Sequence, residues 1–320
     1  MTDPGVISSN IDEAGHRLIA GGLVAVPTET VYGLAANAED GAAVKRIFEV
    51  KGRPHDHPLI VHLADGSLID DGWVGQVSTE LRALAATCWP GPLTVLVPRG
   101  ERVIDEVTGK RPSVGLRVPS HPLTRTLLTT YRIAVAAPSA NRFGKVSPTT
   151  AAHVYDDLGA VLDPKRDLIL DGGPAAIGVE STIVDLTTPT PQILRAGAIT
   201  AEEIAEIIQR SVDNGSGPSR AAGMLTSHYT PDCDIWLAPD RSTAEGWAEL
   251  ARNRGWSIDV LDRTDDLVDA AHRLYADLRA ADAHGLDILV VVTPPPSGLG
   301  VALGDRLAKA AALVSLRPPA

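Results

Sequence analysis

Short apolar runs alternate with amphipathic segments along residues 1–210. Segments such as 40–50 place apolar side chains three and four positions apart, which predicts helices that bury one face. We expect Ser8 or Ser9 to cap the first of these helices. The apolar runs between the helical segments are too short for helices and predict buried strands, for example at 23–26, 93–97, 133–137 and 168–170.

A change of pattern after residue 210 predicts a linker and a second domain. Residues 211–231 begin rich in Gly and Ser, as flexible linkers do. From 232 to 320, apolar runs and helical segments alternate regularly, and we expect the last helix at about 304–314. This order predicts a small parallel sheet between helices, a Rossmann-like three-layer domain. The whole chain is therefore predicted to be α/β, with domains at 1–210 and 232–320.

Composition excludes several classes of protein. Of the 320 residues, 44% are hydrophobic and 22% are charged, and no apolar run is as long as a membrane span, so we expect no membrane association. Only Cys88 and Cys233 are present and the N-terminus lacks a signal peptide, which together predict a cytoplasmic protein. The formal charge of -11 argues against a general nucleic-acid binder but leaves room for a local basic cleft.

The basic turn Lys51-Gly52-Arg53-Pro54 follows the predicted helix at 40–50. Pro54 ends the helix, so Lys51 and Arg53 are held at the end of packed elements. Lysine offers a point charge, and arginine offers a planar fork that can bind phosphate or carboxylate through two hydrogen bonds. The turn therefore predicts an anion site, and the alternative is a solvated turn that contacts nothing.

Small hydroxyls and cations recur where predicted strands end. Ligands of open α/β sheets bind at such strand ends. Without a plausible Ser-His-Asp nucleophile, these side chains predict a site that positions an anionic nucleotide. The alternatives are helix capping for Thr28 and a solvent-facing position for Arg117. The candidates are Thr28, Ser113, Arg117, Ser139, Asn141, Ser181 and Arg195.

Three histidines, His55, His57 and His62, follow the basic turn. They could form a metal site, but no cysteine lies nearby and only Asp56 accompanies them. We therefore predict no metal site built by the protein. His62 gains interest because it directly follows an apolar run beside the basic turn.

Several motifs occur in order along the chain: Pro27-Thr28-Glu29-Thr30-Val31-Tyr32-Gly33-Leu34, Lys51-Gly52-Arg53-Pro54, Pro58-Leu59-Ile60-Val61-His62, Trp89-Pro90-Gly91-Pro92-Leu93-Thr94, Leu116-Arg117-Val118-Pro119, Ala137-Pro138-Ser139-Ala140-Asn141, Gly178-Val179-Glu180-Ser181-Thr182, Leu194-Arg195 and His228-Tyr229-Thr230-Pro231. Together they resemble the YrdC-type L-threonylcarbamoyladenylate synthase family in its long, two-domain form. Each motif is weak alone, whereas the ordered set is highly specific.

The resemblance implies an enzyme that makes L-threonylcarbamoyladenylate from L-threonine, bicarbonate or CO2 and ATP, with release of pyrophosphate. This reaction would be the first step of threonylcarbamoyl-adenosine modification of tRNA next to the anticodon. Downstream tRNA threonylcarbamoyl-transfer proteins would receive the product, and any contact of this chain with RNA would be weak. Mg²⁺ is expected to accompany ATP. The fold implied is a twisted open mixed sheet with a concave cleft.

The resemblance also assigns the candidates to two ligands. Arg117 would suit the substrate carboxylate, and Lys51 and Arg53 would act as catalytic cations on the ATP phosphates. The implied threonine contacts are Thr28, His62, Arg117, Ala137 and Ser181. The implied ATP contacts are Lys51, Arg53, His57, Ser113, Ser139, Asn141, Arg195 and Tyr229.

The sequence departs from the family pattern at three positions. His57 stands where the family often has Asn, Ser227 where it commonly has Lys, and Ala196 where it has Pro. We further expect Tyr229 of the linker to close over the bound nucleotide as a lid, so that the labile product is protected from water.

Two alternative functions make different predictions. A non-catalytic binder of double-stranded RNA would need a cleft rich in Lys and Arg, and its binding would depend steeply on salt. A carbamoyl-transfer module of a larger enzyme would be accompanied by zinc-finger cysteines or an acylphosphatase-like segment, and this chain contains neither. The acidic charge balance and the ordered motifs favour the synthase.

Overall fold

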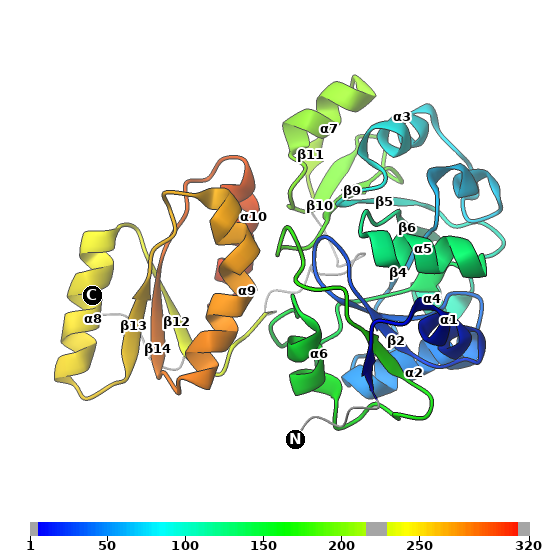
Figure 1. Ribbon diagram of the computed structural model, residues 1–320. Coiled ribbons are helices and arrows are strands. Elements are labelled where there is room, and N and C mark those ends of the chain that lie inside the picture. Colours follow the sequence, from blue (N-terminus) through cyan, green and yellow to red (C-terminus); the bar gives the residue numbers. More distant parts are fainter. Residues whose placement is uncertain (1–5, 216–228, 313–320) are drawn as a thin grey trace. The chain divides into compact units, whose positions relative to one another are not determined.

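The computed structural model describes residues 6–215 and 229–312, which form two compact units (Figure 1). Most of the predicted linker, including Ser227, lies at 216–228 and is outside the described residues. The first unit consists of residues 6–143, 148–176 and 180–215, and the second of 144–147, 177–179 and 229–312. Two short segments of the N-terminal region therefore belong to the second unit.

A mixed sheet forms the centre of the first unit, and its described part has eleven strands. β6 lies parallel to β4 and antiparallel to β5, whereas β5 lies parallel to β9, so the predicted mixed sheet is confirmed. The strand order is β1-β8-β2-β3-β7-β4-β6-β5-β9-β10-β11. The strands are β1 (Ile7–Ser8), β2 (Val24–Val26), β3 (Gly33–Asn37), β4 (Ile60–His62), β5 (Leu93–Pro98), β6 (Ser113–Arg117), β7 (Val135–Ala136), β8 (Leu168–Leu170), β9 (Thr182–Asp185), β10 (Gln192–Arg195) and β11 (Asp213–Asn214).

Helices pack against both faces of this sheet. On one face, Leu18 of α1 and Leu127 of α5 pack with Val24 and Val135 of the sheet. The opposite face carries the larger core, which includes side chains of α2, α3, α6 and α7. The helices are α1 (Ile11–Ile19), α2 (Gly41–Lys51), the 3-10 helix η1 (Gly66–Asp70), α3 (Thr79–Cys88), α4 (Asp105–Thr108), α5 (Pro122–Tyr131), α6 (Ala151–Leu158) and α7 (Ala201–Ile208).

The first helix is capped by Asn10, so the prediction of Ser8 or Ser9 is wrong. The Asn10 side chain accepts hydrogen bonds from the amides of Asp12 (2.9 Å) and Glu13 (3.2 Å). Ser8 instead belongs to β1, which pairs with β8, and its hydroxyl accepts from the Asn10 amide (3.1 Å). Pairing with a distant strand thus shifted the helix start by one or two residues.

One face of β4, β6, β5 and β9 carries polar side chains beside a small apolar cluster. Alternate residues of these strands, such as Val61, Leu116 and Val95, join the main core. The intervening residues point to the face on which α1 and α5 lie, because His62 of β4 pairs with Val135 of β7. A separate small apolar cluster lies on this face and consists of Ile60, Leu96, Ile183 and Leu194.

The second unit is a three-layer α/β domain, as predicted. Its parallel sheet has the order β12-β14-β13. Figure 1 shows α8 on one side of these strands and α9 and α10 on the other. The elements are β12 (Asp234–Ala238), α8 (Arg241–Asn253), β13 (Ile258–Leu261), α9 (Leu267–Ala283), β14 (Ile288–Val292) and α10 (Leu299–Ala310), and α10 therefore begins earlier than the predicted 304. Across 6–215 and 229–312, every helix is too short or too polar to span a bilayer.

A buried carboxylate joins three elements of the first unit. Asp167 is fully buried just before β8, and its two oxygens accept from the Arg46 guanidinium of α2, each at 2.9 Å. The same carboxylate accepts from the amides of Leu23 and Asp163, both at 2.9 Å. Its removal leaves the Arg46 charge and two amides without partners.

Replacing Asp167 by Asn should therefore destabilise the first unit by about 3 kcal/mol, the order expected when one partner of a buried ion pair is lost. Urea unfolding measures the change. Asp70→Asn is the matched control, because Asp70 forms an equally bidentate pair with Arg82 at the surface, and exposed pairs contribute little. Similar losses in both variants would contradict this account.

Candidate functional site

The register of neighbouring strands brings candidate residues from distant motifs onto one face of the sheet. His62 at the end of β4 pairs with Arg117 at the end of β6. β5 lies beside β6, and its Thr94 pairs with Ile183 of β9, which in turn pairs with Arg195 of β10. Directly paired residues project to the same face of a sheet. The side chains therefore form one row across β4, β6, β5, β9 and β10.

Two of the three guanidinium nitrogens of Arg117, Nε and Nη2, have partners in the protein. It is 4% exposed, and its Nη2 donates to Glu29 Oε1 (2.8 Å) and Thr30 Oγ1 (2.9 Å). Its Nε lies 3.4 Å from the carbonyl oxygen of Gly91. Within the described residues, Nη1 has no hydrogen-bond partner. One side of this guanidinium is therefore available to an anion, and Arg117 is not the solvent-facing residue of the alternative.

Glu29 belongs to this site although the sequence analysis did not single it out. It is 7% exposed, and its Oε2 accepts from the Ser120 amide (3.0 Å). Burial alone would raise the pKa of Glu29, but the charge and hydrogen bond of Arg117 outweigh it and hold this pKa below its ordinary value. The carboxylate is therefore ionised at neutral pH. The available signal was an acidic residue between the hydroxyls of Thr28 and Thr30.

The hydroxyls of Thr28 and Thr30 have different partners. Thr28 Oγ1 bonds locally, to the carbonyl oxygen (2.5 Å) and the amide (3.2 Å) of Val31. Thr30 Oγ1 lies 2.9 Å from Thr28 Oγ1 and also reaches Arg117. Thr28 thus shapes the turn and is linked to Arg117 through Thr30, a residue that the assignment by motif omitted.

His62 is a buried neutral ring. Its Nδ1 lacks a hydrogen-bond partner among the residues that the structure describes. Burial, and then the charge of Arg117, lower the pKa of His62 to about 3. A neutral imidazole can accept one hydrogen bond and adds no second positive charge beside Arg117.

Ser181 connects two strands of the row. Arg195 donates from Nε to the Ser181 carbonyl oxygen and from Nη2 to its hydroxyl, both at 3.0 Å, next to a β-bulge in β10. Thr94 Oγ1 lies 2.8 Å from the same hydroxyl. A Cβ on Gly197 would lie 2.3 Å from the nitrogen of the Thr182 amide, so glycine allows the segment after β10 to approach the start of β9. Thr94 is a further site residue that had no role in the prediction.

Lys51 is buried and holds a loop. Its Nζ donates to the carbonyl oxygens of Ser139 (2.6 Å) and Asn141. Burial and the charge of Arg53 hold the pKa of Lys51 well below its usual value. An anion bound beside Nζ would favour the protonated form, which has a third donor. The predicted lysine therefore supports the loop, and its contact with a ligand stays a prediction.

Arg53 and His57 share Phe143 as a neighbour. Arg53 donates to the Pro58 carbonyl oxygen (3.1 Å), and its Cζ lies 5.7 Å from the centre of the Phe143 ring. The His57 ring lies 5.5 Å from the same ring. Burial lowers the pKa of Arg53 to about 10, so it remains charged at neutral pH. Phe143 follows the predicted Asn141 closely in sequence but was not identified by its motif.

The remaining candidates, Ser113, Ala137 and Tyr229, make none of the contacts described above. Ser113 begins β6 and lies on the same face as Arg117, because strand residues alternate. Ala137 is buried, and its amide donates to the Ile60 carbonyl oxygen (3.0 Å). Tyr229 belongs to the second unit, so the proposed lid role stays a prediction.

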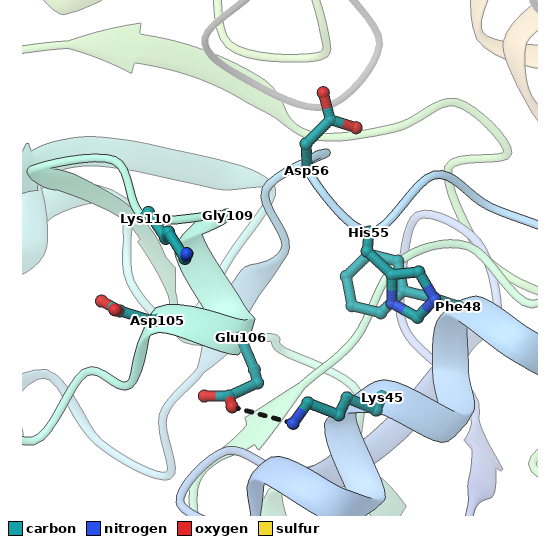
Figure 2. Close-up of a pocket in the computed structure, with 8 residues that line it drawn as sticks. All are labelled: Lys45, Phe48, His55, Asp56, Asp105, Glu106, Gly109 and Lys110. Atoms are coloured by element: carbon teal, nitrogen blue, oxygen red, sulfur yellow. Dashed lines mark ion pairs between the residues drawn. The ribbon is translucent and has the colours of Figure 1, made fainter.

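A separate hollow of about 480 Å³ lies beside the basic turn (Figure 2). Its walls come from α2, the turn at His55 and Asp56, and α4, and an ion pair of 3.3 Å joins Lys45 to Glu106 across it. None of the candidate ligand residues lines it. His55 lies against Phe48 here, away from the neighbours of His57 and His62. In the described part of the chain, no three His, Cys, Asp or Glu side chains gather as a metal site.

Two family models match the chain. Residues 16–197 match the Sua5/YciO/YrdC model, which carries the description telomere recombination. Residues 199–312 match the model described as threonylcarbamoyl-AMP synthase, C-terminal domain.

Individual relatives match along most of their length. Threonylcarbamoyl-AMP synthase of Pyrococcus abyssi is 37% identical over 95% of this chain and 96% of that protein. Threonylcarbamoyl-AMP synthase of Bacillus subtilis is 37% identical over 94% of this chain and 92% of that protein. The crystal structure of P. abyssi Sua5 complexed with L-threonine has a TM-score of 0.88 and 36% identity, and covers 96% of both chains. Escherichia coli YciO, at 23% identity and a TM-score of 0.52, shares the fold over 62% of this chain.

Replacing His62 by Gln tests whether the ring is neutral. Below its ordinary pKa of 6.5, the unfolded chain takes up a proton that the folded ring accepts only near pH 3. From about pH 7.5 to pH 5, wild type should therefore lose roughly 2 kcal/mol more unfolding free energy than His62→Gln. Urea unfolding at both pH values measures this difference. Parallel losses would show that His62 titrates normally.

Proposed function

The chain belongs to the Sua5/YciO/YrdC family, and from this premise we propose that it makes threonylcarbamoyl-AMP from L-threonine, bicarbonate or CO2 and ATP, with release of pyrophosphate. The observation that carries the proposal is the buried Arg117 guanidinium. Its Nη2 is bound by Glu29 and Thr30, and its Nη1 is available to a ligand. Arg117 lies in the same row of side chains as His62 and Arg195. A related protein of the same family has been crystallised with L-threonine.

Arg117 is proposed to bind the threonine carboxylate, because a guanidinium matches a carboxylate in shape and charge. Thr28, Ala137 and Ser181 would surround the rest of the amino acid. The neutral His62 would accept a hydrogen bond from threonine without repelling its ammonium group. This arrangement orients the amine, after its ammonium proton has passed to water, for reaction with CO2, which gives a carbamate and a further proton, or with bicarbonate, which gives a carbamate and water.

The carbamate oxygen would then attack the α-phosphorus of ATP and displace pyrophosphate. Both reactants are anions, so the main task of the protein is to neutralise charge and align them. Lys51 and Arg53 are proposed to meet the phosphates. The other proposed ATP contacts are Ser113, Ser139, Asn141, Arg195, His57 and Tyr229.

Mg²⁺ is proposed to enter as part of the substrate, bound to the phosphates of ATP. Lys51 and Arg53 are cations that suit phosphates and would repel a metal ion, and the carbonyl oxygens of Ser139 and Pro58 beside them already accept hydrogen bonds from these two side chains. We also propose that the product passes to tRNA threonylcarbamoyl-transfer proteins in the cytoplasm. The free thiols of Cys88 and Cys233 are consistent with a reducing compartment.

Pyrophosphate release from ATP tests the proposed reaction, with threonine and bicarbonate omitted in turn. We expect release only when both are present, together with a threonine-containing adenylate detected by mass spectrometry. Release that is indifferent to threonine would indicate another acceptor. Binding of ATP without any release would favour the RNA-binding alternative.

Replacing Arg117 by Ala should lower kcat/KM for threonine about 100-fold, since a hydrogen bond to a charged group contributes about 1.5–3 kcal/mol. The KM for ATP should change little. Arg53→Ala should give the reverse pattern, with the larger effect on ATP. Steady-state kinetics with each substrate varied separately measures both. Equal effects of Arg117→Ala on the two substrates would contradict the assignment.

A further inference from the structure

We propose that Glu29 is a positioning residue for the threonine site, which holds the Arg117 guanidinium so that its Nη1 side faces the substrate carboxylate. The inference rests on the proposed function, because it assigns a role within the same site. Nothing in the motif assignments gave Glu29 a part.

The Glu29 carboxylate is itself held at two points. Oε1 accepts from Arg117 Nη2 (2.8 Å), and Oε2 accepts from the Ser120 amide (3.0 Å). The Thr124 hydroxyl of α5 donates to the carbonyl oxygen of Pro27, which anchors the start of the same loop. The Glu29 side chain is therefore fixed in one conformation. The Arg117 guanidinium that it binds is fixed in one orientation as a result.

Arginine pairs in this chain take two forms, and Arg99 with Asp105 and Arg210 with Glu80 use a single nitrogen, as Arg117 does with Glu29. Arg46 and Arg82 each direct two nitrogens to the two oxygens of one carboxylate, and Arg102 does the same with Glu39. Such a bidentate pair uses one whole side of the guanidinium on its partner. A pair of that form at Arg117 would leave fewer donors for a second carboxylate.

The pair of Arg117 with Glu29 uses only one guanidinium nitrogen. Glu29 occupies a single nitrogen, Nη2, and Thr30 takes the second hydrogen of that nitrogen. In the residues described by the structure, Nη1 therefore keeps both of its hydrogens unengaged. The pair neutralises a buried cation and still leaves donors for a second carboxylate.

The charge of Glu29 also matters when the site is empty. A buried guanidinium without a counter-charge is strongly destabilising. With Glu29 present, the pair is neutral, and threonine, a zwitterion, can enter without changing the net charge of the site. This explains why an acidic residue can stand beside an arginine that must bind an anion.

Glu29→Gln tests the proposal, because glutamine keeps the shape but has only one oxygen to share between Arg117 and the Ser120 amide. Isothermal titration calorimetry on the full chain compares L-threonine with L-threoninamide, which lacks the carboxylate. We expect wild type to prefer threonine, and the variant to lose this preference by roughly tenfold or more, the size of one charge-assisted hydrogen bond. The KM for ATP should stay within about twofold.

Glu39→Gln is the matched control, since it removes an equally short pair with Arg102 at the surface and should leave both affinities unchanged. Glu29→Asp retains the charge if the glutamine variant fails to fold, but its shorter side chain cannot reach both partners, so it should lose part of the same preference. An unchanged ratio of threonine to threoninamide affinity in either folded variant would overturn the role of Glu29. A wild-type protein that releases no pyrophosphate with threonine would instead overturn the proposed function itself.

Discussion

The burial of the Arg117 guanidinium is the constraint on which the candidate site depends. A buried cation requires a counter-charge and hydrogen bonds. Glu29 and Thr30 supply them from the loop after β2, whereas Arg117 comes from the end of β6, far away in the sequence. Their meeting closes this loop over the strand ends and places the Thr28 turn beside the row of candidate side chains. Burial, and after it the charge of Arg117, keep the neighbouring His62 neutral, so this ion pair shapes this part of the site and contributes to its electrostatics.

Because side chains alternate along a strand, one set of residues packs in the core and the other set lies in the candidate site. One set of alternate residues in β4, β6 and β5 enters the main core, and the other set carries His62, Arg117 and Thr94. Gly115 lies between them, where a Cβ would come within 3.2 Å of Thr94 Cγ2. The small apolar cluster around Ile60 continues this face. Apolar neighbours lower the local dielectric, which strengthens the interaction of the cations with any bound anion.

Tyr229, near the end of the predicted linker, packs within the second unit. Tyr229 is buried, and its ring lies 5.5 Å from that of Tyr275, while the Arg306 Cζ is 5.5 Å from the Tyr229 ring. Its φ of 63° is uncommon for a bulky residue, and such a conformation persists only where surrounding contacts support it. The Thr230 amide donates to the Gly144 carbonyl oxygen (3.0 Å), which ties this segment to residues that follow the Asn141 motif. The segment is therefore a packed part of the second unit at these residues.

The sequence by itself determined the α/β class and the small parallel domain, and it predicted most of the side chains of the candidate site, because strand length, helical spacing and ordered motifs are local properties. It also identified Arg117 as a residue that needs a partner. Only the tertiary structure decided which partner, since Glu29, Thr30 and Thr94 are ordinary polar residues until the strand order brings them to Arg117 and Ser181. The cap of the first helix was likewise decided by pairing of β1 with β8. Strand order and register are set by the packing of the whole core, and no local pattern encodes them.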